Sequence, residues 1–198
     1  GQNNNFSGIS CNQGGTPTSS SLCLPAAVDI DPAGNMWIVD SGNNRVLHFP
    51  QVNNQISKTA DLVFGQTSFT TNARGLAANQ LYSPGSVKVS NEGKVFVGDS
   101  GVPPLYLEGR VLVYQPPFSN GMNGVNFASG FKQPHGIAFD TVTTEATSGG
   151  IWISDFINDQ LVLFDYNGIP KKVLFKNEYR ANGACDGNTN LCDSRGSI

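Results

Sequence analysis

Three aspartates recur at corresponding places in this 198-residue chain, and a long polar side chain follows each of them. The aspartates are Asp40, Asp99 and Asp155, and the side chains that follow are Arg45, Arg110 and Gln160. Carboxylates can act as acids or bases in a catalytic site, but catalysis seldom needs the same group in every repeat of a chain. An aspartate at a strand end is also suited to accept backbone N–H groups, and an arginine can meet it across a hairpin. We therefore predict a structural role for all three aspartates.

A second group of oxygen-bearing side chains lies near the end of the sequence. Asp186, Asn188 and Asn190 alternate as the ligands of a calcium loop do. Leu191 takes the place of the usual glycine, and no glutamate closes the loop. The pattern favours a solvated turn, and calcium remains the alternative. No serine–histidine–aspartate arrangement or phosphate-binding loop is present.

The four cysteines form two local pairs, Cys11 with Cys23 and Cys185 with Cys192. Each pair brackets a polar loop that buries little apolar surface, so a crosslink would restrain it where packing cannot. We predict two disulfides and hence an oxidising compartment. Free thiols and a zinc site are the alternatives, although neither pair has the spacing of a zinc knuckle and no histidine lies nearby.

The elements that position these residues repeat. Each copy begins with proline, alternates apolar residues, reaches an aromatic residue and the aspartate, turns, and ends on a second apolar alternation. The copies are Pro25 to Phe49, Pro84 to Tyr114 and Pro134 to Phe164. Alternation with a period of two predicts strands, and Gly- and Asn-rich turns between them predict antiparallel meanders. Trp37, Phe96 and Trp152 share one position, and we expect them to pack between repeats rather than to form a ligand cage.

The stretch GNMWIVDSGNNRVLHF in the first copy resembles an NHL repeat, a unit of β-propellers. The third copy departs from it by Gln160 and by the insert Thr141 to Gly149. The resemblance implies an all-β propeller of four-stranded antiparallel blades in a single domain over 1–198. The repeat units lie near 25–50, 84–115 and 134–165, with outer-strand and crossover segments between them and a further blade beginning near 194–198.

The repeats are longer than the roughly 40 residues of a usual blade, so the chain holds about three of them. Because propellers close with more blades than that, we expect either a segment of a longer polypeptide or a short chain that closes by association.

His135 is the sharpest candidate for chemistry in the third copy. Pro-His-Gly-Ile resembles the metal-binding segment of the peptidyl-hydroxyglycine lyase propellers, in which several blades contribute histidines. The equivalent residues here are Ala26 and Gly85, which bind no metal, and His48 belongs to another strand. One imidazole does not hold a catalytic zinc. We therefore expect no cofactor, with zinc or calcium as minor alternatives.

The charge content of the chain bears on the classes of partner that it can bind. Charged residues make up 14% of the chain and the net charge is -3, which gives no basis for binding nucleic acid or an anionic membrane. No stretch is long enough to insert in a membrane. The sequon at Asn5 agrees with secretion and glycosylation.

These observations favour a secreted or cell-surface protein that binds protein or glycan partners, or copies of itself, without catalysis. The recognition surface is expected on four long loops. These are Thr67 to Gln80, Ser100 to Glu108, Phe118 to Phe131 and Thr141 to Gly149. The alternative is a propeller lyase or hydrolase whose metal ligands lie in other blades, and an intracellular interaction module is disfavoured by the paired cysteines.

Overall fold

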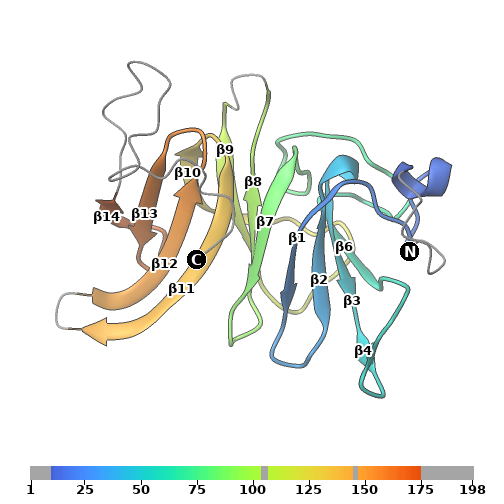
Figure 1. Cartoon of the computed structure of the whole chain (residues 1–198), viewed down its shortest axis with the longest axis horizontal. Helices are drawn as coiled ribbons and strands as arrows, with labels where there is room; N and C mark the ends of the chain where they lie inside the picture. The colour runs from blue at the N-terminus through green and yellow to red at the C-terminus, as the bar shows by residue number, and fades with distance from the viewer. Residues whose placement is uncertain (1–9, 104–106, 145–146, 175–198) are drawn as a thin grey trace.

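The computed structural model describes residues 10–103, 107–144 and 147–174, and of 141–144 and 147–148 it describes the backbone alone. Within these residues the chain is all-β. Its strands form three four-stranded antiparallel sheets and one two-stranded ribbon (Figure 1). We refer to the three sheets as blades 1, 2 and 3.

Blade 1 has the order β1-β2-β3-β6. Its strands are β1 (Pro25–Ile30), β2 (Met36–Asp40), β3 (Arg45–Phe49) and β6 (Leu62–Phe64). The ribbon pairs β4 (Gln51–Val52) with β5 (Gln55–Ile56), and two short 3₁₀ helices, η1 (Cys11–Gly14) and η2 (Ser41–Asn43), complete this part. Asp31 closes the turn between β1 and β2, because its carboxylate accepts the N–H groups of Ala33 and Asn35.

Blades 2 and 3 repeat this meander. Blade 2 contains β7 (Pro84–Val89), β8 (Val95–Asp99), β9 (Gly109–Tyr114) and β10 (Val125–Phe131). Blade 3 contains β11 (Pro134–Thr144), β12 (Thr147–Asp155), β13 (Gln160–Phe164) and β14 (Pro170–Leu174). The register is equivalent in all three, since the template proline pairs with the template aspartate: Pro25 with Asp40, Pro84 with Asp99, and Pro134 with Asp155.

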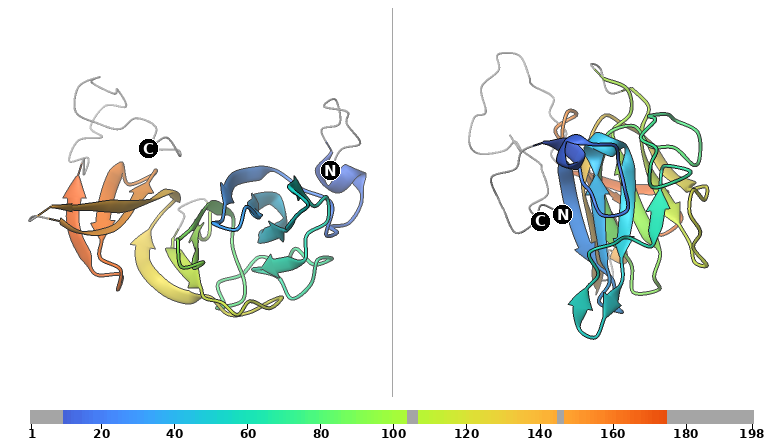
Figure 2. Two further views of the ribbon diagram at one scale, coloured as in Figure 1. Left: turned by 90° about the horizontal axis from the view of Figure 1, so that it is seen from below. Right: turned by 90° about the vertical axis from the view of Figure 1, so that its right-hand side faces the viewer.

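The blades stand side by side in an arc, which the view from below shows most clearly (Figure 2). Their first strands are neighbours: β7 contacts β1 on one side and β11 on the other. Successive meanders whose first strands meet along a common axis are the arrangement of a β-propeller. The fold class expected from the sequence is therefore confirmed.

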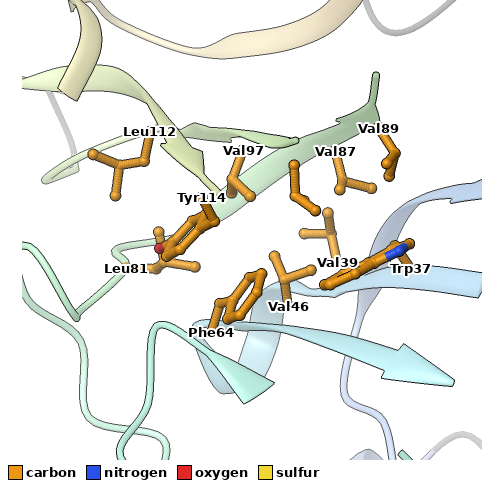
Figure 3. Packing of buried hydrophobic residues seen from close by; sticks show 11 residues of the cluster. Trp37, Val39, Val46, Phe64, Leu81, Val87, Val89, Val97, Leu112 and Tyr114 are labelled. Carbon is orange, nitrogen blue, oxygen red and sulfur yellow. The ribbon is translucent and has the colours of Figure 1, made fainter. Parts of the chain in front are cut away.

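Apolar side chains fill the spaces between blades. Trp37, Val39 and Val46 of blade 1 pack against Val97 and Tyr114 of blade 2 (Figure 3). On the opposite face of blade 2, a second cluster joins it to blade 3, and this cluster includes Phe96, Val111, Ile151 and Ile153. Blade 2 is thus apolar on both faces, and burial of each large side chain stabilises the stack by about 1.5–3 kcal/mol.

Two segments expected as loops contain strands. Residues 118–131 include β10, the outermost strand of blade 2, and Asn120 and Gly121 just before it bond to the backbone of Val63 in blade 1. The insert Thr141 to Gly149 lengthens the hairpin of β11 and β12, since Thr143 pairs with Ser148. Both predictions were wrong because backbone pairing across a hairpin or along a sheet edge needs no apolar alternation in sequence.

Candidate functional site

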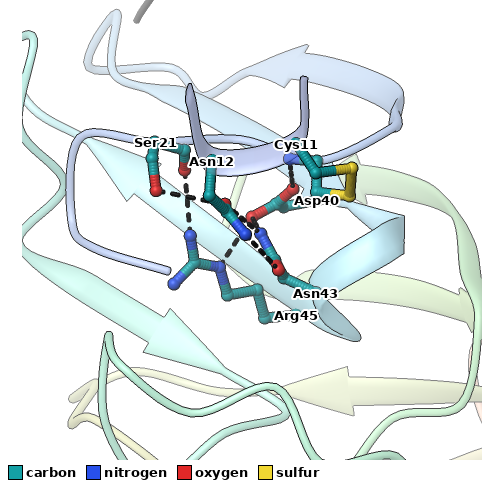
Figure 4. Close-up of a disulfide and its surroundings, with 7 residues drawn as sticks. Cys11, Asn12, Ser21, Asp40, Asn43 and Arg45 are labelled. Atoms are coloured by element: carbon teal, nitrogen blue, oxygen red, sulfur yellow. Dashed lines mark hydrogen bonds and ion pairs between the residues drawn. A yellow bond between two sulfur atoms is a disulfide. The ribbon is translucent and has the colours of Figure 1, made fainter. Parts of the chain in front are cut away.

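Each template aspartate receives several hydrogen bonds at the end of its strand. Asp40 is fully buried. It accepts hydrogen bonds from the backbone N–H of Cys23 (2.6 Å), from Asn43 Nδ2 (2.8 Å) and from Arg45 Nε (2.7 Å) (Figure 4). The bond to Cys23 holds the segment that leads into β1, so the carboxylate joins the start of one strand to the end of the next.

Arg45 extends this junction to the crossover between blades 1 and 2. Its guanidinium donates to the carbonyl oxygens of Thr18, Ser21 and Phe69 at 2.6 to 3.0 Å. The side chain is fully buried. A buried guanidinium without partners would be very unfavourable, and these bonds satisfy it. Because the partners lie at the end of β2, before β1 and in the crossover, Arg45 joins three segments of the chain.

Blade 2 repeats the arrangement with fewer donors on the carboxylate. Asp99 accepts from the backbone N–H of Tyr82 (2.6 Å) and from Arg110 Nε (3.1 Å). Arg110 in turn donates to the carbonyl oxygens of three crossover residues, Leu76, Ala77 and Gln80. The segment Thr67 to Gln80, expected as a recognition loop, is therefore held from both ends by buried or partly buried arginines.

In blade 3 neutral amides replace the arginine. Asp155 accepts from the backbone N–H groups of Lys132 and Gln133 and from Asn158 Nδ2 (2.6 Å), while Gln160 Nε2 lies 3.4 Å away. Three good donors compensate for the weak contact with Gln160. The departure of Gln160 from the template is thus accommodated by the neighbouring Asn158.

Asp99 lacks an asparagine donor that the template aspartates of the other two blades have. Asn43 and Asn158 stand three residues after their aspartates and donate to them, but Val102 occupies this position in blade 2. Burial raises the pKa of Asp99 to about 7, although the bonds from Tyr82 and Arg110 act in the opposite direction. Blade 2 therefore holds a buried carboxyl group that titrates near neutral pH, a property that is frequent at functional sites.

Ser100, the next residue, lies at the surface of an open cavity. The cavity measures about 650 Å³ and lies where the first strands of all three blades begin. We call it the serine cavity. Its lining residues are Ala26, Ala27, Val28, Ser41, Ser83, Pro84, Gly85, Ser100, Gln133 and His135. Ser100 is 2% exposed, and its Oγ has no hydrogen-bond partner among the described residues.

His135 extends over the neighbouring blade inside this cavity. Its ring stacks on Phe156, with centroids 5.7 Å apart and an interplanar angle of 6°. A Cβ atom on Gly85 would lie 2.6 Å from Cδ2 of His135. The absence of a side chain at position 85 therefore makes room for the imidazole.

Ser83 adds a strained backbone to the same cavity. Its φ is +56°, and Leu24, the equivalent residue before the proline of blade 1, has φ +48°. Left-handed conformations at residues other than glycine cost of order 1–3 kcal/mol and gather at functional sites. The bond from Ser83 N–H to Asn44 Oδ1 (3.0 Å) holds the residue in place.

The disulfide between Cys11 and Cys23 is present and belongs to the junction in blade 1. Within the loop that it closes, Asn12 exchanges hydrogen bonds with Asn43, the residue that donates to Asp40. The other half of the cysteine prediction, Cys185 with Cys192, lies outside the described residues. So do the sequon at Asn5 and the possible calcium ligands Asp186, Asn188 and Asn190.

The aromatic residues of the template lie on one face of each blade. Trp37 and Phe96 are buried between blades. Trp152, in blade 3, is partly buried and donates to Asp140 Oδ2.

Within residues 10–103, 107–144 and 147–174, no three side chains of histidine, cysteine, aspartate or glutamate come close enough to hold a metal ion. The same part of the chain contains no helix with the length and apolar character to cross a membrane.

The serine cavity was not predicted from the sequence. One sequence feature could have pointed to it, because Asp-Ser-Gly recurs at the ends of the strands that finish at Asp40 and Asp99. The serines of these two motifs, Ser41 and Ser100, both line the cavity. The convergence of these serines with His135 depends on how the blades stand to one another, which the sequence does not state.

The fold and the cavity define the class: the chain is an all-β protein built from β-propeller blades. No protein-family model and no curated protein sequence matches it. Among solved structures it is similar to virginiamycin B lyase from Staphylococcus aureus, with 14% identity, a TM-score of 0.40, and coverage of 76% of this chain and 40% of that one. The chain thus spans less than half the length of the lyase, and the likeness carries no inference about activity.

Proposed function

We propose that this chain is a non-catalytic binding protein of the extracellular space that recognises a small neutral polar group in the serine cavity. The observation that carries the proposal is the convergence of small polar residues from all three blades, Ser41, Ser83, Gln133 and His135, on one open cavity. A ligand with hydrogen-bonding groups would complement this lining.

The chemistry of the lining supports a neutral ligand. The polar residues Ser41, Ser83, Gln133 and His135 are among the lining residues, and no lysine, arginine, aspartate or glutamate is among them. The apolar residues Ala26, Val28 and Pro84 supply the rest of the wall. Amides and sugar hydroxyls complement such a surface, which agrees with protein or glycan partners.

Binding is favoured over catalysis by what the cavity contains. The lining provides one imidazole, whereas a catalytic zinc takes three protein ligands. The template aspartates are committed to backbone and arginine donors inside the blades. The disulfide supports an extracellular location, because such bonds persist in oxidising compartments. Membership of the NHL group is part of this proposal and rests on the repeat pattern.

A titration followed by NMR tests the proposal. N-acetylglycinamide and N-acetylglucosamine serve as neutral probes, and we expect at least one to shift the amide signals of Gly85, Ser100 and His135. Ala26→Phe should abolish these shifts, because Ala26 is exposed and a phenyl ring there fills the cavity without entering the core. Val52→Phe is the matched control, since Val52 is 58% exposed on β4 and does not line the serine cavity. Equal shifts in both variants, or none in the wild type, would contradict the proposal.

A further inference from the structure

The two ends of the three-blade arc carry the same apolar pattern as the faces that pack together inside it. We call the face of a blade that bears the template aromatic residue its forward face, and the opposite face its rear face. At each of the two inner junctions, the forward face of one blade packs against the rear face of the next. Blade 1 therefore begins the arc with a rear face, and blade 3 ends it with a forward face (Figure 2).

The forward face of blade 3 has the residue types of an inner face but not their burial. In blades 1 and 2 the template aromatic residue and the first apolar residue of the third strand are at most 5% exposed. These residues are Trp37 and Val46 in blade 1 and Phe96 and Val111 in blade 2. Their equivalents in blade 3, Trp152 and Leu161, are only partly buried. Among the described residues, no sheet covers this face.

The rear face of blade 1 differs from the other rear faces in the same way. In blade 2 the residues that cover the preceding blade are 0% exposed, and in blade 3 they are at most 4% exposed. They are Leu81, Val95 and Val97 in blade 2 and Phe131, Ile151 and Ile153 in blade 3. The equivalent residues of blade 1, Leu22, Met36 and Ile38, are all partly exposed. The arc thus ends on two complementary apolar faces, each built for a neighbouring blade.

We propose that a second copy of this chain binds to both end faces and closes a ring. The rear face of blade 1 in the second copy packs on the forward face of blade 3 in the first, and the other two end faces meet in the same way. The chain itself indicates this partner, because it carries both halves of a junction that it already forms twice. Contacts between unlike faces generate rings when the rotation closes. Two copies supply three sheets each, a total within the roughly four to eight blades at which propellers close.

The ring bears on the serine cavity, although the inference does not depend on the proposed function. The cavity lies where the first strands of the three blades begin, and these strands are neighbours along the inside of the arc. Closing the ring would bring the first strands of the second copy to the same axis. The open side of the cavity would then face the equivalent strands of the second copy.

Sedimentation velocity of the whole chain tests the inference. We expect the wild type to sediment with twice the 21.0 kDa of one chain. Ile38→Lys on the rear face and Leu161→Lys on the forward face should each weaken association at least about 30-fold, as for an unpaired charge buried at an interface. In the free chain both positions are partly exposed, so a lysine can hold its ammonium group in water. Val125→Lys is the matched control, since Val125 is 61% exposed on β10 of the middle blade and lies on neither end face.

A mixture of the two face variants tests whether unlike faces meet. Each variant keeps one intact end face, so Ile38→Lys and Leu161→Lys in equal amounts should form pairs of chains at concentrations where neither variant does so alone. Such pairs are held by one junction instead of two, and they should dissociate more readily than the wild type. A fold damaged by the substitutions would not recover on mixing, and thermal melting of each variant measures such damage directly.

The possible results separate a ring of two copies from the alternatives. A wild type that remains a single chain would overturn the inference, and the end faces would then belong to a contact with a sheet of a different chain. Equal effects of Ile38→Lys, Leu161→Lys and Val125→Lys, or a mixture that stays monomeric, would also overturn it. Growth beyond two copies would refute closure of the ring at two chains.

Discussion

Replacement of Arg45 by glutamine imitates in blade 1 what blade 3 has naturally. Arg45 is fully buried and donates to Asp40 and to three backbone carbonyls. A glutamine reaches at most part of this set. Breaking a buried ion pair by removing one partner costs about 3–5 kcal/mol. For a chain of this size each kcal/mol lowers the melting temperature by roughly 2–4 °C, so we expect a decrease of roughly 6–20 °C.

Gln160→Ala is the matched control in blade 3. The Nε2 atom of Gln160 lies 3.4 Å from Asp155, and Asp155 keeps its bonds from Lys132, Gln133 and Asn158. We expect a loss of about 1 kcal/mol or less. Thermal unfolding followed by circular dichroism measures both variants. If Arg45→Gln melts no lower than Gln160→Ala, the view of Arg45 as the fastening between three segments is refuted.

Three further predictions concern the cavity, the carboxyl behind it and the disulfide. Ser100→Ala should leave the free energy of unfolding unchanged or raise it by up to about 1 kcal/mol, because it removes a buried hydroxyl that has no hydrogen-bond partner among the described residues; a clear loss of stability would contradict this. The pKa of Asp99 is raised from 3.8 to about 7, so its stabilising contribution is complete below the lower value and is lost as pH rises through the upper one. Urea unfolding should therefore show a decline of about 4 kcal/mol between these pH values that is absent in Asp99→Asn, and parallel profiles would count against it. Replacing Cys11 and Cys23 together by serine should cost about 3 kcal/mol, as expected for a loop of this length, and an unchanged urea midpoint would show that the bond does not stabilise the fold.

Much of the blade architecture could be predicted from the sequence because it is local. The alternation around Trp37 and Phe96 and the turn residues between strands specify hairpins, and repetition specifies that the hairpins form equivalent units. The pairing of Asp40 with Arg45 could be anticipated for the same reason, since both residues flank one turn.

The rest depends on contacts between blades. Strand β10 could not be predicted, because it lies in a polar, glycine-rich stretch without apolar alternation. Its place in the sheet is determined by pairing with β9. The serine cavity combines Ser41, Ser100 and His135 from three separate units. No spacing in the sequence indicates that these three residues lie close together. Their proximity depends on the packing of neighbouring blades, through Val39 and Tyr114 in one cluster and Phe96 and Ile153 in the other.

The position of His135 over Gly85 has a consequence for any exchange of the repeats. The two residues occupy the same template position in neighbouring units, yet the ring of one fills the space above the other. Replacing the second unit by a copy of the third, with the original third unit kept in place, would put a side chain where the ring of His135 already lies. The three repeats share one sequence pattern, but the residue after the template proline differs between them and suits the neighbouring blade. The order of the repeats along the chain is therefore part of what the sequence encodes.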